Sequence, residues 1–321
     1  AWESVMWWEE ELAWALALTL VATVAWGAHW LFASRLLQSP PPMGNAHRAS
    51  RTRSGYFLTF VLAATAASLL LISMGLSSVF AEVTGSWRPT DGSRLLEEIG
   101  GPLLLAVPFL VAWWWHLRRA GTEALAFGGQ DHARATRRAG RLVVAFVGLA
   151  GLTIGLTWEL QALLDAMASS GQETLFSSDE VTDVSTSALA GALVGLALWA
   201  PAWVLSQRDR AYDVVTAATA TARRAYLFLV SGLAVVALMV ALAFVIYQGT
   251  RLLLDTELVD DASWALAVLV VATFVLAYHL CCLRADMLVA RSVEVPATLA
   301  LDEGRVIETI EIIAPAGADF K

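Results

Sequence analysis

Long apolar stretches constrain this sequence more than any other feature. Each of them has about the twenty-residue length that spans the roughly 30 Å hydrocarbon core of a bilayer. The seven stretches are residues 12–33, 56–80, 99–117, 142–164, 186–205, 225–249 and 262–283. Because lipid offers no hydrogen-bond partners to the backbone, such stretches span the membrane as helices. The sequence therefore predicts an all-α integral membrane protein with seven transmembrane helices.

The composition supports the same class. Hydrophobic residues make up 58% of the chain and charged residues 16%, which is outside the usual range of soluble domains. The formal net charge of −8 averages two faces of opposite sign. It gives no argument for or against nucleic acid, and no nucleic-acid partner is expected.

The basic residues predict the orientation of the helices. All of the 21 basic residues except Arg88, Arg94 and Arg251 fall on one side of the seven-helix arrangement. The positive-inside rule places that side in the cytoplasm, with the N-terminus outside and the C-terminus inside. The acidic Glu3 and Glu9 precede the first stretch, so we expect a membrane anchor there and no cleaved leader. The expected location is the cytoplasmic (inner) membrane of a bacterium.

Two series of residues recur along the chain. Arg51, Arg137 and Arg223 are each 86 residues apart, and each opens an apolar stretch. A second series runs in step with the first: His29, His116 and Trp203 are 87 residues apart, and His279 follows 76 residues later. The spacing predicts three parallel helix-pair repeats of about 86 residues and one half repeat.

The domain organisation is predicted to change near the end of the chain. Residues 1–290 form the seven-helix repeat domain, and residues 291–321 form a cytoplasmic tail. Val293 and Val295, followed by the stretch from Val306 to Ile313, suggest one or two β-strands. The tail is too short for a core of its own, so it would either begin a soluble β-containing domain or offer an edge to a partner.

Three histidines are candidates for cofactor binding. His29, His116 and His279 fall at matching depths near the predicted cytoplasmic ends of their helices. Imidazoles at membrane depth bind haem or a metal when two of them face each other. The alternative is an interfacial aromatic belt, because Trp26 and Tyr278 are among the rings that surround these positions.

Polar groups within the apolar stretches are few. No ionisable residue lies near a helix midpoint, whereas such residues usually mark ion or substrate pathways. Glu159 and Gln248, near the outer ends of their helices, are the candidate ligand-binding residues. Snorkelling to the interface is the alternative.

The cytoplasmic arginines are candidate contacts for lipid or for a partner protein, at about 1 kcal/mol per basic residue near an anionic surface. They are Arg51, Arg53, Arg137, Arg138, Arg141, Arg223 and Arg224.

Two small-residue motifs allow helices to approach closely. Gly151 and Gly155 form one motif, and Gly191 and Gly195 form the other. Packing inside one subunit, self-association and contact with another membrane protein are all open.

The recurring residues also suggest a family. Trp26-x-x-His29-Trp30, and Arg223-Arg224-x-Tyr226 before an apolar helix, resemble an uncharacterised family of bacterial multi-pass membrane repeat domains. The resemblance covers residues from about 10 to 290. It departs from the pattern where Trp203 stands in place of His. It implies the repeat and the topology, and it brings no functional residues.

These observations favour a protein without catalytic activity, since no nucleotide-binding loop, zinc-ligand set or nucleophile elbow is present. The leading hypothesis is a membrane scaffold, sensor or accessory subunit whose basic loops contact lipid or a partner, with no cofactor. One alternative is a transporter or channel for an apolar or weakly polar solute. Another is a haem-binding redox subunit.

Overall fold

The computed structural model describes residues 17, 20–21, 24–40, 50–85, 96–168, 178–254 and 262–302. Over these residues the regular structure is helical, beginning with a helical segment at residues 24–37. The elements that follow are α3 (Arg51–Thr84), the π-helix η1 (Leu96–Gly100), α5 (Gly101–Ala168), α6 (Ser178–Tyr212), α7 (Val214–Thr219), α8 (Thr221–Leu253) and α9 (Ala262–Asp302).

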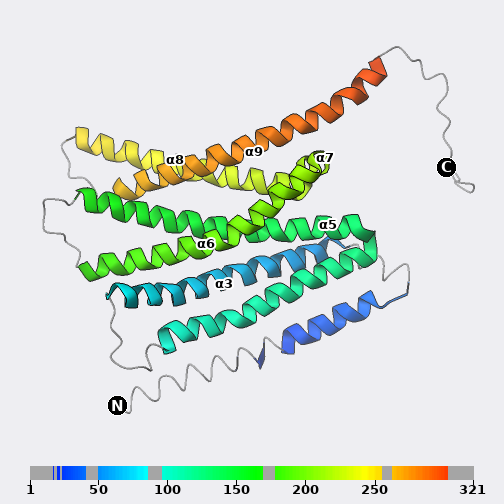
Figure 1. Cartoon of the computed structure of the whole chain (residues 1–321), viewed down its shortest axis with the longest axis horizontal. Coiled ribbons are helices and arrows are strands. Elements are labelled where there is room, and N and C mark those ends of the chain that lie inside the picture. Colours follow the sequence, from blue (N-terminus) through cyan, green and yellow to red (C-terminus); the bar gives the residue numbers. More distant parts are fainter. Residues whose placement is uncertain are drawn as a thin grey trace, which may run out of the picture.

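The long element α5 consists of two helices joined by a sharp turn. Gly129 breaks it with φ 69° and ψ −160°, a backbone conformation that a residue without Cβ adopts at little cost. The chain therefore turns back at Gly129, and the two parts of α5 run in opposite directions (Figure 1). We call residues 101–128 the first half of α5 and residues 129–168 the second half.

Six described helices are long and apolar enough to cross a membrane. They are Arg53–Thr84, Glu98–Ala126, Gly129–Ala168, Ser185–Tyr212, Thr221–Leu253 and Ala262–Ser292. These helices confirm the prediction of a helical, multi-pass membrane protein, and they contain six of the seven predicted stretches. The remaining stretch, 12–33, lies partly outside the described residues.

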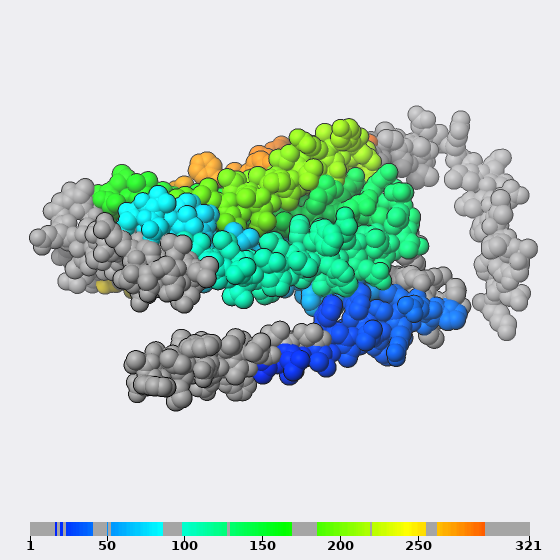
Figure 2. Space-filling model, turned by 60° about the horizontal axis from the view of Figure 1, so that its bottom comes forward, coloured from blue at the N-terminus to red at the C-terminus, as the bar shows by residue number. Residues whose placement is uncertain are grey.

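The helices lie side by side and alternate in direction (Figure 1). The turn within α5, the short α7 and the C-terminal part of α9 gather at one end of the bundle, at the right in Figure 1. We call this the basic end, because it carries Arg53, Arg138, Arg141, Arg210 and Arg223. The segment 24–37 lies against the first half of α5 (Figure 2), where the ring of Trp30 is 4.7 Å from that of Trp115.

Close packing between α5 and α6 depends on glycine. A Cβ added to Gly148 would lie 2.5 Å from the backbone nitrogen of Trp199, and one added to Gly155 would lie 2.5 Å from the carbonyl oxygen of Ala188. A Cβ on Gly195 would collide with the backbone nitrogen of Leu152. Small residues on both helices therefore let the two backbones touch, as in other membrane helix pairs.

The four predicted glycines differ in their surroundings. Gly155 and Gly195 lie in the α5–α6 contact, and a Cβ on Gly151 would meet Leu69 of α3. A Cβ on Gly191 would meet nothing within 4 Å. Three of the four glycines are thus used for packing within the chain, and self-association through this set stays a prediction.

The most buried apolar side chains form a cluster that links five helices. Val61 of α3, Leu142 of α5, Trp203 of α6, Leu227 of α8 and Leu283 of α9 all belong to it. Large apolar side chains elsewhere on the helices are exposed, as expected for surfaces that face lipid.

The strand prediction for the tail was wrong in its first part. Helix α9 continues to Asp302, so Val293 and Val295 are helical. Extending an existing helix adds one hydrogen bond per residue, whereas a strand would need a partner strand. Val306 to Ile313 lies outside the described residues.

Candidate binding site at the basic end

Three carboxylates at the basic end are each bound by two arginines, and we call these groups the Arg–carboxylate–Arg triads. Glu123 is bound by Arg53 at 2.6 Å and by Arg119 at 2.8 Å. Asp209 is bound by Arg138 at 3.3 Å and Arg141 at 2.5 Å, and Asp286 by Arg210 at 2.7 Å and Arg223 at 2.6 Å.

The alternation of helix directions creates the triads. Each carboxylate lies on a helix that runs toward the basic end, whereas Arg53, Arg138 and Arg223 lie near the start of helices that run away from it. Neighbouring antiparallel helices therefore bring opposite charges together across 70, 71 and 63 residues of sequence. Each triad carries two positive charges and one negative charge.

The Arg223–Asp286 pair of the third triad is buried. Arg223 is 3% exposed and Asp286 is 1% exposed. The remaining donors of Arg223 are also used, since Nη1 donates to the hydroxyl of Ser206 at 3.1 Å and Nη2 donates to Gln207 Oε1 at 3.2 Å. The guanidinium also lies 5.2 Å from the centre of the Trp203 ring. A buried ion pair with these hydrogen bonds ties α6, α8 and α9 together.

Two of the triads adjoin similar aromatic clusters. In the first cluster the rings of Tyr56 and His116 are 6.0 Å apart, and in the second those of Tyr226 and His279 are 5.8 Å apart. Tyr226 lies 170 residues after Tyr56, as Arg223 does after Arg53. His279 and Asp286 each lie 163 residues after His116 and Glu123. The same arrangement of side chains is thus built twice.

Both histidines have the same backbone hydrogen bond. His116 Nδ1 lies 2.7 Å from the carbonyl oxygen of Ala112, and His279 Nδ1 lies 2.8 Å from that of Val275. A carbonyl oxygen only accepts, so Nδ1 is the donor in both rings. His279 Nε2 then faces the hydroxyl of Tyr226 at 3.5 Å, whereas His116 Nε2 is buried without a hydrogen-bond partner among the described residues.

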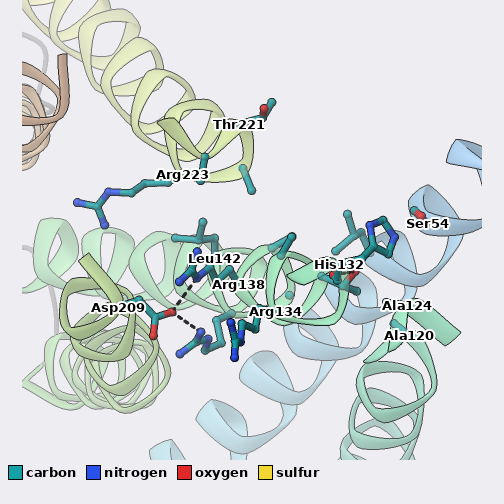
Figure 3. Close-up of a pocket in the computed structure, with 18 of the residues that line it drawn as sticks. Ser54, Ala120, Ala124, His132, Arg134, Arg138, Leu142, Asp209, Thr221 and Arg223 are labelled. Carbon is teal, nitrogen blue, oxygen red and sulfur yellow. Dashed lines mark hydrogen bonds and ion pairs between the residues drawn. The ribbon is translucent and has the colours of Figure 1, made fainter. Parts of the chain in front are cut away.

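A cavity of about 810 Å³ opens between the triads. It is bounded by α3, both halves of α5, the end of α6, α7 and the start of α8 (Figure 3). Five arginines and four carboxylates line it: Arg53, Arg134, Arg138, Arg141, Arg223, Glu123, Asp131, Asp209 and Asp213. Figure 3 shows the Asp209 carboxylate within reach of two arginines. The volume lies in the range of cavities that hold small ligands.

Asp213 contributes a fixed negative charge to this cavity. It caps α7, where its carboxylate accepts a hydrogen bond from the backbone amide of Thr216 at 3.0 Å. The hydrogen bonds from the hydroxyl and amide of Thr216 hold the pKa of Asp213 below its usual value. This carboxylate is therefore ionised at neutral pH.

The structure divides the three predicted histidines between two aromatic clusters. His29 is exposed, and its ring lies 6.0 Å from that of Tyr56. His116 belongs to the same cluster and stacks on Phe60 with 4.5 Å between ring centres, whereas His279 belongs to the second cluster. Aromatic rings thus surround each buried imidazole, and haem or metal binding by these residues stays a prediction.

Glu159 and Gln248 are in different surroundings. Glu159 Oε2 accepts a hydrogen bond from Ser185 at 2.9 Å, which links α5 to α6. Gln248 is buried in α8. Neither lines the cavity at the basic end or a second, apolar cavity of about 340 Å³ between α5, α8 and α9. These two cavities therefore give no support to ligand binding at Glu159 or Gln248.

The arginines predicted to contact lipid or a partner differ in their surroundings. Arg53, Arg138, Arg141 and Arg223 belong to triads and are held by carboxylates. Arg224 donates from Nε to the carbonyl oxygen of Ala218 at 3.0 Å. Arg137 is exposed, and the side chain of Arg51 lies outside the described residues.

Sequence reasoning missed the carboxylates of the triads. Glu123 follows His116 by seven residues, Asp209 follows Trp203 by six, and Asp286 follows His279 by seven. The carboxylates thus run in step with the series of His and Trp residues. That spacing was the available signal for the site.

Comparison with known proteins shows that part of the chain is similar to an uncharacterised family. Residues 138–278 match the model of a domain of unknown function, DUF5671. The match confirms the resemblance to an uncharacterised family, and it covers most of the second half of α5, then α6, α7, α8 and the first part of α9. No curated protein and no solved structure matches the chain.

Proposed function

We propose that this protein is a non-catalytic integral membrane protein, a sensor or accessory subunit, that binds its ligand or partner at the basic end. The observation that carries the proposal is the cavity between the Arg–carboxylate–Arg triads. Each triad has one more positive than negative charge, so the basic end attracts anions. The helices supply a rigid frame, because the same ion pairs connect one helix to the next.

The proposal includes an architecture of seven helices with the basic end in the cytoplasm of a bacterial cell. Three helix-pair repeats and a half repeat account for the regular recurrence of the triads between α3 and α5, α5 and α6, and α8 and α9. The arginines concentrated at this end support the orientation through the positive-inside rule.

Cysteine labelling tests the orientation. We expect the Thr84→Cys variant, at the end of α3 opposite the basic end, to react with a membrane-impermeant maleimide added to intact cells. The Gln130→Cys variant, beside the turn at the basic end, should react only after the inner membrane is opened. Cys281 and Cys282 are first replaced by Ser. Labelling of the Gln130→Cys variant in intact cells would contradict the orientation.

The proposed function is tested on protein released from native membranes with a mild detergent. Native mass spectrometry should find the chain together with a bound molecule or a partner subunit, and that species should diminish when Arg141 is replaced by Gln. Arg251→Gln, on the last turn of α8 at the opposite end, is the matched control and should change nothing. A chain that emerges alone from the membrane would refute the function.

A further inference from the structure

The middle triad differs from the other two in how its arginines are used. Arg138 donates from Nε and Arg141 from Nη2, and both donate to the same oxygen of Asp209, Oδ2. A guanidinium group has five N–H donors arranged as a planar fork. Each of these arginines therefore keeps most of its donors for another acceptor. Both line the cavity, and their side chains are 24% and 27% exposed.

Of the other triads, only Arg53 and Arg223 line the cavity, and both use more of their donors within the protein. Arg53 makes a two-pronged pair with Glu123, with Nε at 2.6 Å and Nη2 at 2.7 Å. Arg223 uses all three of its nitrogens for Asp286, Ser206 and Gln207. Among the triad arginines that line the cavity, Arg138 and Arg141 therefore keep the most unused donors for a ligand.

The charge around the cavity is positive. The lining holds five arginines and four carboxylates, and the neighbouring Arg119, Arg210 and Asp286 complete the triads. The described residues therefore place seven arginines against five carboxylates. Asp131 and Asp213 are exposed, whereas the shared Asp209 is the acid nearest to the unused donors.

The wall of the cavity contains apolar side chains as well as charged ones. Phe57, Leu58 and Val61 of α3 and Leu117 and Leu142 of α5 also line it. A ligand that fits both parts has an anionic head and an apolar body. Phosphate suits the head better than a carboxylate, because its several oxygens can accept from two guanidinium forks at once.

We infer that this cavity binds the phosphate ester of an anionic amphiphile, with Arg138 and Arg141 as its ligands. The inference rests on the proposed function and names the ligand class of that site. A phospholipid headgroup and a soluble phosphate ester share this chemistry. Arg138 and Arg141 carry two positive charges, and Asp209 neutralises one of them. The ligand neutralises the other.

The test uses the full-length chain in detergent and native mass spectrometry with named probes. We expect dilauroyl phosphatidylglycerol to bind with a Kd at least about tenfold lower than that of dilauroyl phosphatidylcholine. Replacing Arg141 by Gln should raise the Kd for phosphatidylglycerol about tenfold, since a charge-assisted hydrogen bond to the phosphate is lost. Arg118→Gln is the matched control, because Arg118 is exposed at the same end, lies over Trp114 and does not line the cavity.

Competition by millimolar glycerol phosphate identifies the source of the phosphate. Displacement of phosphatidylglycerol supports a soluble phosphate ester, and no displacement supports the lipid. If the Arg141→Gln variant does not fold, the inference is tested instead with the Arg138→Gln variant and with the comparison of the two lipids on the unaltered chain.

Several outcomes would overturn the inference. They are equal binding of the two lipids, equally tight binding of laurate, or an equal loss of affinity in the Arg118→Gln variant. A partner found on protein from native membranes, together with equal lipid binding, would leave the proposed function standing without the phosphate site. Failure of both experiments would remove both proposals.

Discussion

Replacing Asp286 by Asn is expected to lower the free energy of unfolding by about 3–5 kcal/mol. Asn keeps the shape of the side chain but removes the charge that neutralises Arg223, which is 3% exposed. A guanidinium group that is buried without its carboxylate is strongly destabilising. Arg210 loses the same partner, at 2.7 Å. Unfolding in mixed detergent micelles measures the effect.

A matched variant separates this effect from a general loss of charge. Asp131 is bound to Arg134 at the same end of the bundle, but its side chain is 94% exposed. Because exposed ion pairs contribute about 0–1 kcal/mol, the Asp131→Asn variant should unfold almost as the unaltered chain does. The double variant Arg223→Met and Asp286→Leu should recover much of the lost stability. Equal losses for Asp286→Asn and Asp131→Asn would show that burial of the pair is unimportant.

The Gly195→Ala variant is expected to lose about 1–3 kcal/mol of stability. The added Cβ collides with the backbone nitrogen of Leu152 and lies 2.7 Å from the carbonyl oxygen of Gly148. Backbone atoms have no other rotamer to adopt, so α5 and α6 must move apart along their contact. The same unfolding measurement, or the melting temperature in detergent, checks this expectation.

Gly191 provides the control on the same helix, one turn earlier. A Cβ at this position meets nothing within 4 Å, so the Gly191→Ala variant should retain its stability or gain some helix propensity. If both variants lose the same amount, the cost lies in the helix itself and the close contact between α5 and α6 is not its cause.

The sequence was sufficient for the transmembrane helices because each one depends on local properties. About twenty apolar residues predict a membrane-spanning helix wherever they occur. The ends of the helices were harder to place, since the predicted stretch 99–117 lies within a helix that continues to Ala126. Beyond the apolar stretch, helix formation continues through charged residues such as Arg119 and Glu123, whose side chains pair with each other.

The sequence predicted the arginines of the candidate site but not its carboxylates. The arginines stood out because they begin helices at regular intervals, and they were interpreted as contacts for lipid or partner. Glu123, Asp209 and Asp286 received no role, because acidic residues contribute little to the positive-inside rule. Their spacing from His116, Trp203 and His279 carried the missing information.

The sequence by itself determined that charged residues collect at the ends of apolar helices, since hydrocarbon does not solvate charge. Only the tertiary structure decided which charges meet. Arg223 pairs with Asp286 across 63 residues, and Arg138 and Arg141 share Asp209 across 71 and 68 residues. Those partners depend on which helices are neighbours and how closely α5 and α6 approach. The same packing leaves the cavity and its unused arginine donors, which no local pattern encodes.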